Sequence, residues 1–239
     1  MINYGMPTEA DRSYMEKIIE ISDLNKIYQN EEVSVEVIKK LNLDIFKGEF
    51  ISIMGPSGSG KSTLLYLMGG LEKPTSGVVK IGNEAIHLMK DSQESAMRRS
   101  TLGFVFQFYN LVPHLTVEDN ILLPILLNGG KRKDYKERLQ HLIEVVGLTD
   151  KRKSFPTRLS GGQQQRVAIA RALINNPDII LADEPIGNLD SKTGTEIMEL
   201  FRKINKEEGK TIIQVTHSKE SALYGDRIIF VRDGELATA

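Results

Sequence analysis

The chain has 239 residues, 40% of them hydrophobic, which is enough to bury the core of one large α/β domain. Its 31 Lys and Arg nearly balance its 32 Asp and Glu, so the formal net charge is −1 and no whole-protein field attracts nucleic acid or anionic lipid. The absence of cysteine excludes disulfides, thiolate zinc sites and a cysteine nucleophile, and it fits a reducing cytoplasm.

Residues 1–16 are polar and mixed in charge, so we expect an N-terminal extension and not a secretory signal. The most apolar stretches, Ile121–Leu127 and Val167–Ile174, are far shorter than the ~20 residues that a membrane span needs. We therefore expect that the chain does not cross a bilayer. The basic triplets at 131–133 and 151–153 have acidic neighbours, and we interpret them as solvated helix ends.

The first structured elements are expected to be strands. Ile18–Ile21 and Val33–Ile38 alternate apolar and polar side chains and are rich in β-branched residues, which predicts an antiparallel β layer. Later strands are expected at Phe50–Met54, Gly103–Phe106, Asp178–Ala182, Thr211–Val215 and Arg227–Val231. Helical patterns at Lys61–Met68 and Ser191–Asn205 alternate with them. This alternation predicts a largely parallel sheet covered by helices, and therefore an α/β fold.

Strand patterns are missing between Gln107 and Ile174. Helical patterns occupy this block instead, at Val117–Leu127, Asp134–Val146 and Gly161–Ile174. The sequence therefore predicts a helical subdomain, at about residues 108–174, inserted into the α/β domain.

A glycine-rich motif joins the strand Phe50–Met54 to the helix that starts at Lys61. Residues 55–62, GPSGSGKS, fit the pattern G-x-x-x-x-G-K-[ST], in which bare backbone N–H groups surround phosphate oxygens at a positive helix end. Lys61 is expected to neutralise the β- and γ-phosphates, Ser62 to ligate Mg²⁺, and Thr63 to contact the α-phosphate. An ordinary glycine-rich turn is the alternative, and the strand before it and the helix after it argue against that reading.

Two adjacent carboxylates end the apolar strand that leads to Ala182. Asp183 is placed to hold the Mg²⁺ shell, while Glu184, one residue further, can polarise the water that attacks the γ-phosphate. A strand that ends in Asp-Glu is ordinary by itself. The upstream phosphate-binding motif makes the catalytic interpretation the favoured one.

A second glycine-rich motif, LSGGQ at 159–163, precedes a strongly helical run. Ser160 is a natural N-cap, and the two glycines leave N–H groups bare at a positive helix end. The motif therefore predicts a second anion site, with a capped helix of flexible start as the structural alternative.

Over residues 17 to 235 the sequence resembles the nucleotide-binding domains of ABC ATPases. The resemblance identifies 55–62 as Walker A, 159–163 as the signature and 179–184 as Walker B. It also implies that Gln107 is the Q-loop glutamine, that 187–190 is the D-loop, and that His217 is the switch histidine. The fold implied is a P-loop NTPase of RecA-like type over residues 17–239, with the N-terminal antiparallel β layer and the helical insertion.

The resemblance implies ATP and Mg²⁺ as ligands. Residues implied to bind the nucleotide are Tyr28, Gly55, Pro56, Ser57, Gly58, Ser59, Gly60, Lys61, Ser62, Thr63, Ser160, Gly161, Gly162, Gln163 and Asp190. The metal would be held by Ser62, Gln107 and Asp183, and catalysis would be carried by Glu184, His217 and Gln107. Outside this family pattern, Tyr28 reads as a strand-edge residue, Gln107 as a surface residue and His217 as structural.

ABC domains pair head to tail, so the resemblance implies a second copy of the chain as partner, with each ATP between one copy's Walker A and the other's signature. It also implies an integral membrane permease, no nucleic acid, and a peripheral place on the cytoplasmic face of the membrane. The amino-acid sequence around Gln107, around Asn120 and at 159–166 is most similar to that of the group of macrolide exporters, lipoprotein-releasing complexes and bacitracin-type peptide resistance.

Two other assignments stay open: an importer ATPase of amino-acid or methionine type, and a soluble ABC ATPase of Fe–S assembly type. The sequence also departs from the group at two positions. Ile186 stands where threonine is usual, and Ser218 follows the histidine where an acidic or amide residue is common. The loss of a hydroxyl at 186 bears on how the segment up to Asp190 crosses the dimer interface.

Overall fold

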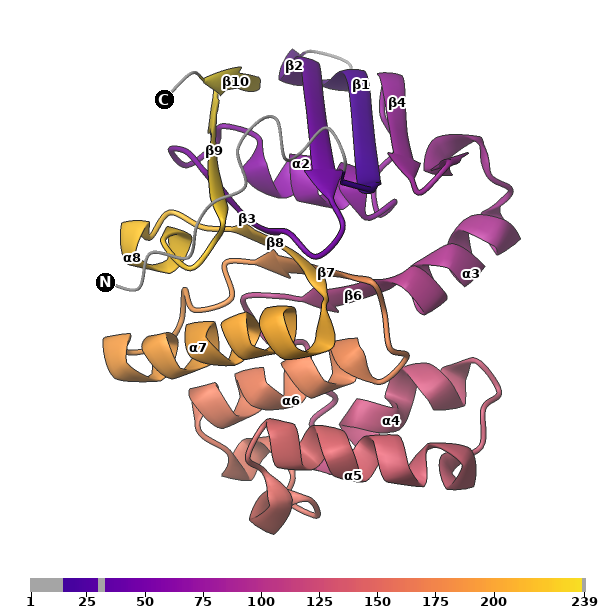
Figure 1. Ribbon diagram of the computed structural model, residues 1–239, viewed down its shortest axis with the longest axis vertical. Coiled ribbons are helices and arrows are strands. Elements are labelled where there is room, and N and C mark those ends of the chain that lie inside the picture. Colours follow the sequence, from indigo (N-terminus) through magenta and orange to yellow (C-terminus); the bar gives the residue numbers. More distant parts are fainter. Residues whose placement is uncertain (1–14, 30–32, 238–239) are drawn as a thin grey trace.

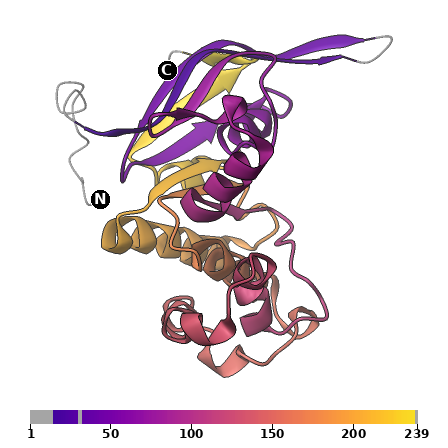
Figure 2. The ribbon, with the colours of Figure 1, turned by 90° about the vertical axis from the view of Figure 1, so that its right-hand side faces the viewer.

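The computed structural model describes residues 15–29 and 33–237, so most of the expected N-terminal extension lies outside the described residues. Figure 1 shows three levels: an antiparallel β layer, a second sheet below it, and a group of helices beyond that sheet. The turned view in Figure 2 gives the same order, with the first hairpin reaching out past the body of the molecule.

The expected antiparallel layer is present as a four-stranded sheet in the order β2-β1-β4-β5. Its members are β1 (Lys17–Gln29), β2 (Ser34–Phe46), β4 (Ser76–Ile81) and β5 (Glu84–Ala85). The predictions of Ile18–Ile21 and Val33–Ile38 were too short, and β4 and β5 were missed. Polar residues and register shifts interrupt the alternation along β1 and β2, so the sequence pattern stops before the hydrogen-bonded ladder does.

The expected parallel sheet has six strands in the order β10-β9-β3-β8-β7-β6. They are β3 (Phe50–Met54), β6 (Leu102–Val105), β7 (Ile179–Asp183), β8 (Thr211–Val215), β9 (Arg227–Arg232) and β10 (Glu235–Ala237). All neighbouring pairs are parallel except β10 with β9. The carboxyl ends of β3, β7 and β8 therefore meet at one edge, where ligands bind in open α/β sheets.

The α-helices in the described residues are α2 (Lys61–Met68), α3 (Asp91–Thr101), α4 (Val117–Leu127), α5 (Lys136–Val145), α6 (Gly161–Leu173), α7 (Ser191–Glu208) and α8 (Lys219–Ala222). Between β6 and β7 the chain forms only helices and loops, as its pattern predicted. The stretch predicted as a helix from Asp134 begins instead as a 3-10 turn, Arg132–Tyr135. Helix α3 was missed because its sequence is almost wholly polar and buries only Glu94.

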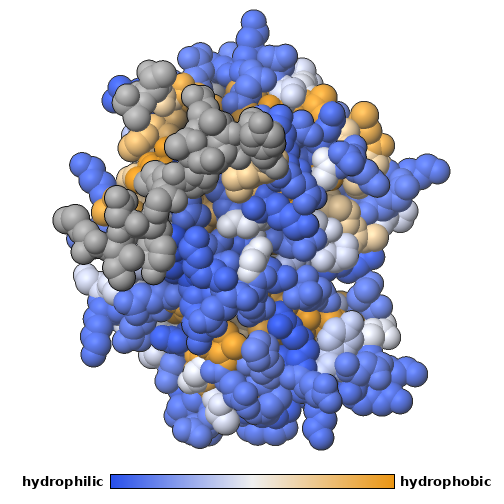
Figure 3. Space-filling model, viewed as in Figure 1, coloured by the Kyte–Doolittle hydropathy of each residue, from blue (hydrophilic) through white to orange (hydrophobic). Residues whose placement is uncertain are grey.

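Two apolar clusters form the core, one on each face of the parallel sheet. The first contains residues of α4, α5, α6 and α7 against one face. The second contains Leu64, Leu65, Leu67 and Met68 of α2 together with residues of both sheets, so α2 lies between the two β layers (Figure 1). None of the described helices is long and apolar enough to span a membrane. Polar side chains cover most of the face in Figure 3, and apolar residues form only separate small areas there.

The sequence had indicated that the basic triplets at 131–133 and 151–153 are only solvated helix ends, and the structure shows that they are more than that. The side chain of Glu118 at the start of α4 is only 4% exposed, and it accepts hydrogen bonds from Arg132, Arg152 and Lys153. Burial alone would raise the pKa of Glu118, but the hydrogen bonds from Lys153 and Arg152 lower it. The basic residues therefore compensate a buried carboxylate that the sequence pattern did not reveal.

Asn120 of α4 is fully buried and holds the loop that leads into this helix. Its Nδ2 donates to the carbonyl oxygens of Val112, Leu115 and Thr116 at 3.0–3.1 Å, and its Oδ1 accepts from Val112 N at 2.8 Å. In the sequence, Asn120 is only one residue of a segment that resembles the exporter group, and no pattern gave it a structural role. Its side chain supplies the loop with hydrogen bonds that no helix or strand provides.

We expect Asn120→Ala to lower the free energy of unfolding by about 3 kcal/mol, because a fully buried side chain is truncated and its four hydrogen bonds to the loop backbone are lost. Denaturant unfolding followed by circular dichroism measures the change. Asn83→Ala, at an exposed turn, is the matched control and should stay within about 0.5 kcal/mol of the unchanged chain. Equal stability of the two variants would contradict the role of Asn120.

Candidate functional site

The loop between β3 and α2 has the backbone conformation that its glycines permit. Gly58 and Gly60 have φ of 77° and 96°, in the left-handed region that side chains other than glycine rarely adopt. A Cβ on Gly60 would also lie 2.7 Å from the carbonyl oxygen of Val37 on β2. The close approach to β2 and the bare N–H groups at the start of α2 both depend on these two glycines.

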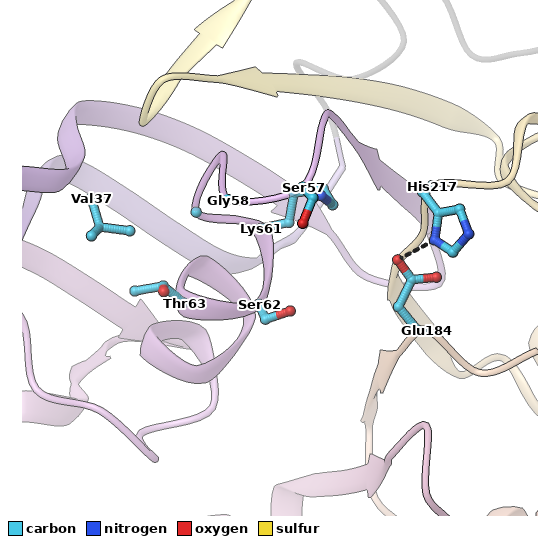
Figure 4. Close-up of a pocket in the computed structure, with 9 residues that line it drawn as sticks. Val37, Ser57, Gly58, Lys61, Ser62, Thr63, Glu184 and His217 are labelled. Atoms are coloured by element: carbon cyan, nitrogen blue, oxygen red, sulfur yellow. Dashed lines mark hydrogen bonds and ion pairs between the residues drawn. The ribbon is translucent and has the colours of Figure 1, made fainter. Parts of the chain in front are cut away.

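This loop lines a pocket of about 380 Å³ at the carboxyl edge of the parallel sheet. Its lining residues are Val37, Ser57, Gly58, Gly60, Lys61, Ser62, Thr63, Glu184 and His217. Figure 4 shows Glu184 and His217 on the side of the pocket that faces the glycine-rich loop. All of these residues were expected from the sequence except Val37, which could have been found only from the pairing of β2 with its neighbours.

Lys61 is the buried cation at this pocket. Its Nζ donates to the carbonyl oxygen of Pro56 at 2.8 Å, and the residue is 8% exposed. Ser59 is buried as well, whereas Gly55 and Pro56 form the backbone that leads into the loop. The loop thus fixes the position of an ammonium group beside a helix N-terminus, and both features favour an anion.

Asp183, the last residue of β7, is hydrogen-bonded by two residues of α2. Ser62 Oγ donates to Asp183 Oδ1 at 2.9 Å, and the hydroxyl of Tyr66 donates to Asp183 Oδ2 at 2.7 Å. Burial, followed by the hydrogen bond to Asp183, raises the pKa of Tyr66 to about 12. The sequence reasoning had paired Ser62 with Asp183 but had missed Tyr66, for which no motif gives a signal.

Glu184 follows β7 and meets His217, which follows β8. The Oε1 of Glu184 lies 2.9 Å from Nδ1 of His217, whose side chain is 71% exposed (Figure 4). Glu184 has a φ of 46°, and its N–H donates to the carbonyl oxygen of Val215 at 3.0 Å. A non-glycine residue in this conformation is uncommon, and here the neighbouring strand holds it.

Gln107 lies beyond the end of β6 and is not among the residues that line this pocket. Its Nε2 donates to Oδ1 of Asn188 at 3.3 Å, and Nδ2 of Asn188 donates back to the carbonyl oxygen of Gln107 at 3.0 Å. The pair links the start of the helical block to the segment after β7. Asp190, two residues on, caps α7 by accepting from Thr193 N at 3.0 Å, and hydrogen bonds from Thr193 lower the pKa of Asp190.

The LSGGQ motif forms the N-terminus of α6, away from the residues that line the pocket. Ser160 Oγ accepts from Gln163 N at 3.3 Å, while Ser160 N donates to Gln163 Oε1 at 3.0 Å, which is a capping box. Gly161 and Gly162 leave the first turn without side chains, and a Cβ on Gly161 would lie 2.9 Å from the hydroxyl of Tyr109. The structure confirms the predicted N-cap at Ser160, while anion binding at this helix end stays a prediction.

Arg171 of α6 binds the loop after Gln107. Its guanidinium donates to the carbonyl oxygens of Tyr109 and Asn110 at 2.6 and 2.5 Å. These two residues have φ of 59° and 50°, so an ion-assisted pair of hydrogen bonds holds a loop conformation that is costly for non-glycine residues. Burial lowers the pKa of Arg171. Sequence reasoning missed this contact between the signature helix and the Q-loop segment.

Tyr28 lies around the site, as do Ile186 and Ser218, the two residues that depart from the family pattern. Tyr28, near the tip of the β1–β2 hairpin, is 40% exposed, and Lys26 Nζ lies 4.7 Å from the centre of its ring. It does not line the pocket. Ile186 packs on the first core cluster, with Gly194 beside it, and Ser218 Oγ caps α8 by accepting from Ser221 N at 3.2 Å. Both departures therefore fill structural positions.

Comparison with known proteins gives the same assignment. The sequence profile of ABC transporters matches residues 38–187. The lipoprotein-releasing system ATP-binding protein LolD of Geobacter metallireducens is 43% identical over 222 residues, which is 93% of this chain and 99% of LolD. The macrolide export ATP-binding/permease protein MacB of Shigella flexneri is also 43% identical over 222 residues, but these are only 34% of MacB.

A solved structure of the ATP-binding cassette MJ0796 of Methanocaldococcus jannaschii, a dimer bound to ADP and Pi in a post-hydrolysis state, has a TM-score of 0.84. Its sequence is 45% identical, and the match covers 92% of this chain and 97% of that one. The chain therefore belongs to the ABC transporter family, with the P-loop NTPase fold. Within that family it is an ATP-binding subunit and an ABC-type ATPase, similar to the group that contains LolD and MacB.

Proposed function

We propose that the chain binds Mg·ATP in the pocket at the glycine-rich loop and hydrolyses it to drive a membrane export or mechanotransmission machine. The observation that carries this proposal is the convergence of Lys61, Ser62 and Glu184 on one pocket. These residues come from two segments of the sequence, 55–63 and 184, that only the parallel sheet brings together.

The phosphates of ATP would lie on the backbone N–H groups of residues 57–62. The start of α2 contributes the positive end of its dipole there, and Lys61 adds a full charge. Lys61 would exchange its hydrogen bond with the Pro56 carbonyl for phosphate oxygens, a substitution that keeps the ammonium group hydrogen-bonded. We expect Tyr28 to stack on the adenine from the hairpin.

Ser62 Oγ and Asp183 Oδ1 fit a magnesium site. They are hard oxygen ligands 2.9 Å apart, and Mg²⁺ usually combines one or two protein oxygens with phosphate oxygens and water. The described residues hold no group of three His, Asp or Glu that would suit a metal bound by the protein alone. Bound there, Mg²⁺ would neutralise charge on the β- and γ-phosphates, and Gln107 would reach the same site after releasing Asn188.

Glu184 is the residue placed to polarise the attacking water. Its carboxylate lies opposite the glycine-rich loop, and the exposed imidazole of His217 is hydrogen-bonded to it (Figure 4). His217 would hold the carboxylate in position and contact the γ-phosphate. Both side chains follow adjacent strands, so their spacing is set by the ladder between β7 and β8.

The complete site is expected to need a second copy of the chain. The bare N-terminus of α6 is a site for anions but does not line the pocket of its own chain. A head-to-tail dimer would place Ser160 to Gln163 of one copy against the nucleotide of the other, with Asp190 at the interface. The dimeric form of MJ0796 supports this arrangement.

The partner in the membrane is proposed to dock in a groove beside the Q-loop segment. The groove has a volume of about 400 Å³, and its floor is mainly apolar, with Leu71, Phe104, Phe106 and Pro124 beside Arg98. An integral membrane permease would place the chain peripherally on the cytoplasmic face of the membrane. The name of MacB joins an ATP-binding part and a permease in one protein, which supports such a partner.

The cargo is proposed to be a peptide, an antibiotic or a lipoprotein, since LolD and MacB carry lipoprotein release and macrolide export in their names. An importer ATPase of amino-acid or methionine type, or a soluble ATPase of Fe–S assembly type, is the alternative. No nucleic-acid partner is proposed, because the net charge of −1 gives no field that would attract a phosphate backbone.

We expect Glu184→Gln to bind ATP, to form a stable dimer and to hydrolyse ATP at least about 100-fold more slowly, because the water loses its general base while Ser62 and Asp183 are untouched. Steady-state phosphate release and size-exclusion chromatography with ATP measure the two effects. Glu199→Gln, on the exposed face of α7, is the control and should behave as wild type. Wild-type turnover in Glu184→Gln would remove Glu184 from the proposed mechanism.

Ser160→Arg should abolish hydrolysis, because a bulky cation replaces the cap that faces the partner's nucleotide, while binding of ATP to the monomer stays within about twofold. Binding is measured by equilibrium dialysis at a concentration where the chain is monomeric. Activity equal to wild type would exclude the head-to-tail site.

Affinity capture of the chain from detergent-solubilised membranes of its own host should recover a multi-span permease. Phe106→Glu should lose that permease, because it places a carboxylate in the apolar part of the groove, and should still bind ATP. Capture of soluble Fe–S assembly proteins by both forms, with no permease, would favour the alternative function.

A further inference from the structure

Asp183 is held on both of its oxygens by one helix. Ser62 and Tyr66 are four residues apart on α2, so their side chains lie on the same face of that helix. Ser62 Oγ bonds to Oδ1 at 2.9 Å and the Tyr66 hydroxyl to Oδ2 at 2.7 Å, across 121 and 117 residues of sequence. The two bonds fasten the end of β7 to the first two turns of α2.

A bound cation would affect the two hydrogen bonds of the Asp183 carboxylate differently. A cation that enters between Ser62 and Asp183 must rearrange their hydrogen bond, because both oxygens would turn their lone pairs to the ion. The bond from Tyr66 lies on the other oxygen and is compatible with an occupied site. It is therefore the contact able to orient the carboxylate both before and during metal binding.

We propose that Tyr66 is a positioning residue of the magnesium site, which it serves by fixing the rotation of the Asp183 carboxylate through a hydrogen bond to Oδ2. This inference rests on the proposed function, in which Asp183 serves the metal. The terminal torsion of aspartate has a broad energy minimum, so a carboxylate held at one oxygen alone still swings. With Tyr66 in place, Oδ1 stays directed at Ser62.

The rest of Tyr66 has a separate, structural task. Its ring packs against the second core cluster, between the two β layers. Phenylalanine keeps that ring and removes only the hydroxyl, so Tyr66→Phe separates orientation of the carboxylate from packing. Tyr135 offers a matched control, because its ring also packs partly buried against a core cluster, the first one, within the helical block.

The experiment measures Mn²⁺ binding, by electron paramagnetic resonance, to the full chain saturated with a non-hydrolysable ATP analogue. We expect Tyr66→Phe to bind Mn²⁺ about tenfold more weakly, at the lower end of the effect of losing an outer-shell partner of a metal ligand. The Mg²⁺ concentration that half-saturates hydrolysis should rise by a similar factor. Binding of the analogue in EDTA and every property of Tyr135→Phe should be unchanged, while Tyr66→Phe should still unfold in one cooperative transition, lowered by only a few degrees because one hydrogen bond is lost.

Unchanged Mn²⁺ affinity in a folded Tyr66→Phe would overturn this inference and leave the proposed function intact, since wild type would still hydrolyse ATP. Equal weakening of analogue binding with and without metal would also overturn it, because the hydroxyl would then shape the whole pocket. Failure of wild type to bind Mn²⁺ with the analogue would instead count against the proposed function itself.

Discussion

The burial of α2 between two β layers is the constraint on which the rest of the site depends. One end of this short helix carries Lys61 and Ser62, and its apolar side chains join the antiparallel sheet to the parallel one. Because both layers hold it, the helix cannot shift without opening the core. Every residue that meets α2 at the carboxyl edge, from Asp183 to His217, therefore faces a fixed helix N-terminus. The antiparallel layer, far from the helical block, serves the pocket through this contact.

The sequence predicted five of the six strands of the parallel sheet, most of its helices and every pocket residue except Val37, because strand, loop and helix follow each other there without interruption by distant contacts. Each glycine of residues 55–60 and the capping box at 160–163 is a local feature, and local features can be read from a chain. The sequence did not predict β4, β5, β10 or α3, because the three strands are short and α3 is almost wholly polar. It also missed the hydrogen bonds made by Tyr66, Arg171 and Asn188, since each joins residues that are at least 61 positions apart in the sequence. Contacts of that kind depend on topology.

The two glycine-rich motifs have the same physical design in different settings. Each presents bare N–H groups at the positive end of a helix, but α2 is enclosed by sheets while α6 belongs to the helical block. Arg171, in the last turn of the signature helix, connects that helix to the loop after Gln107 by two hydrogen bonds. A change at the groove beside Phe106 would thereby reach the N-terminus of α6. The groove, lined in part by Arg171, and the N-terminus of α6 therefore belong to one connected unit.

The reciprocal amide pair of Gln107 and Asn188 spans the boundary between that unit and the segment after β7. The Asn188 side chain makes both of these bonds, whereas the Gln107 side chain makes one and the Gln107 backbone carbonyl accepts the other. Rotation of Asn188 therefore releases both contacts across the boundary, while rotation of Gln107 leaves the bond to its carbonyl oxygen in place. Control of this boundary lies with the residue on the β7 side, and the helical block alone releases only half of it.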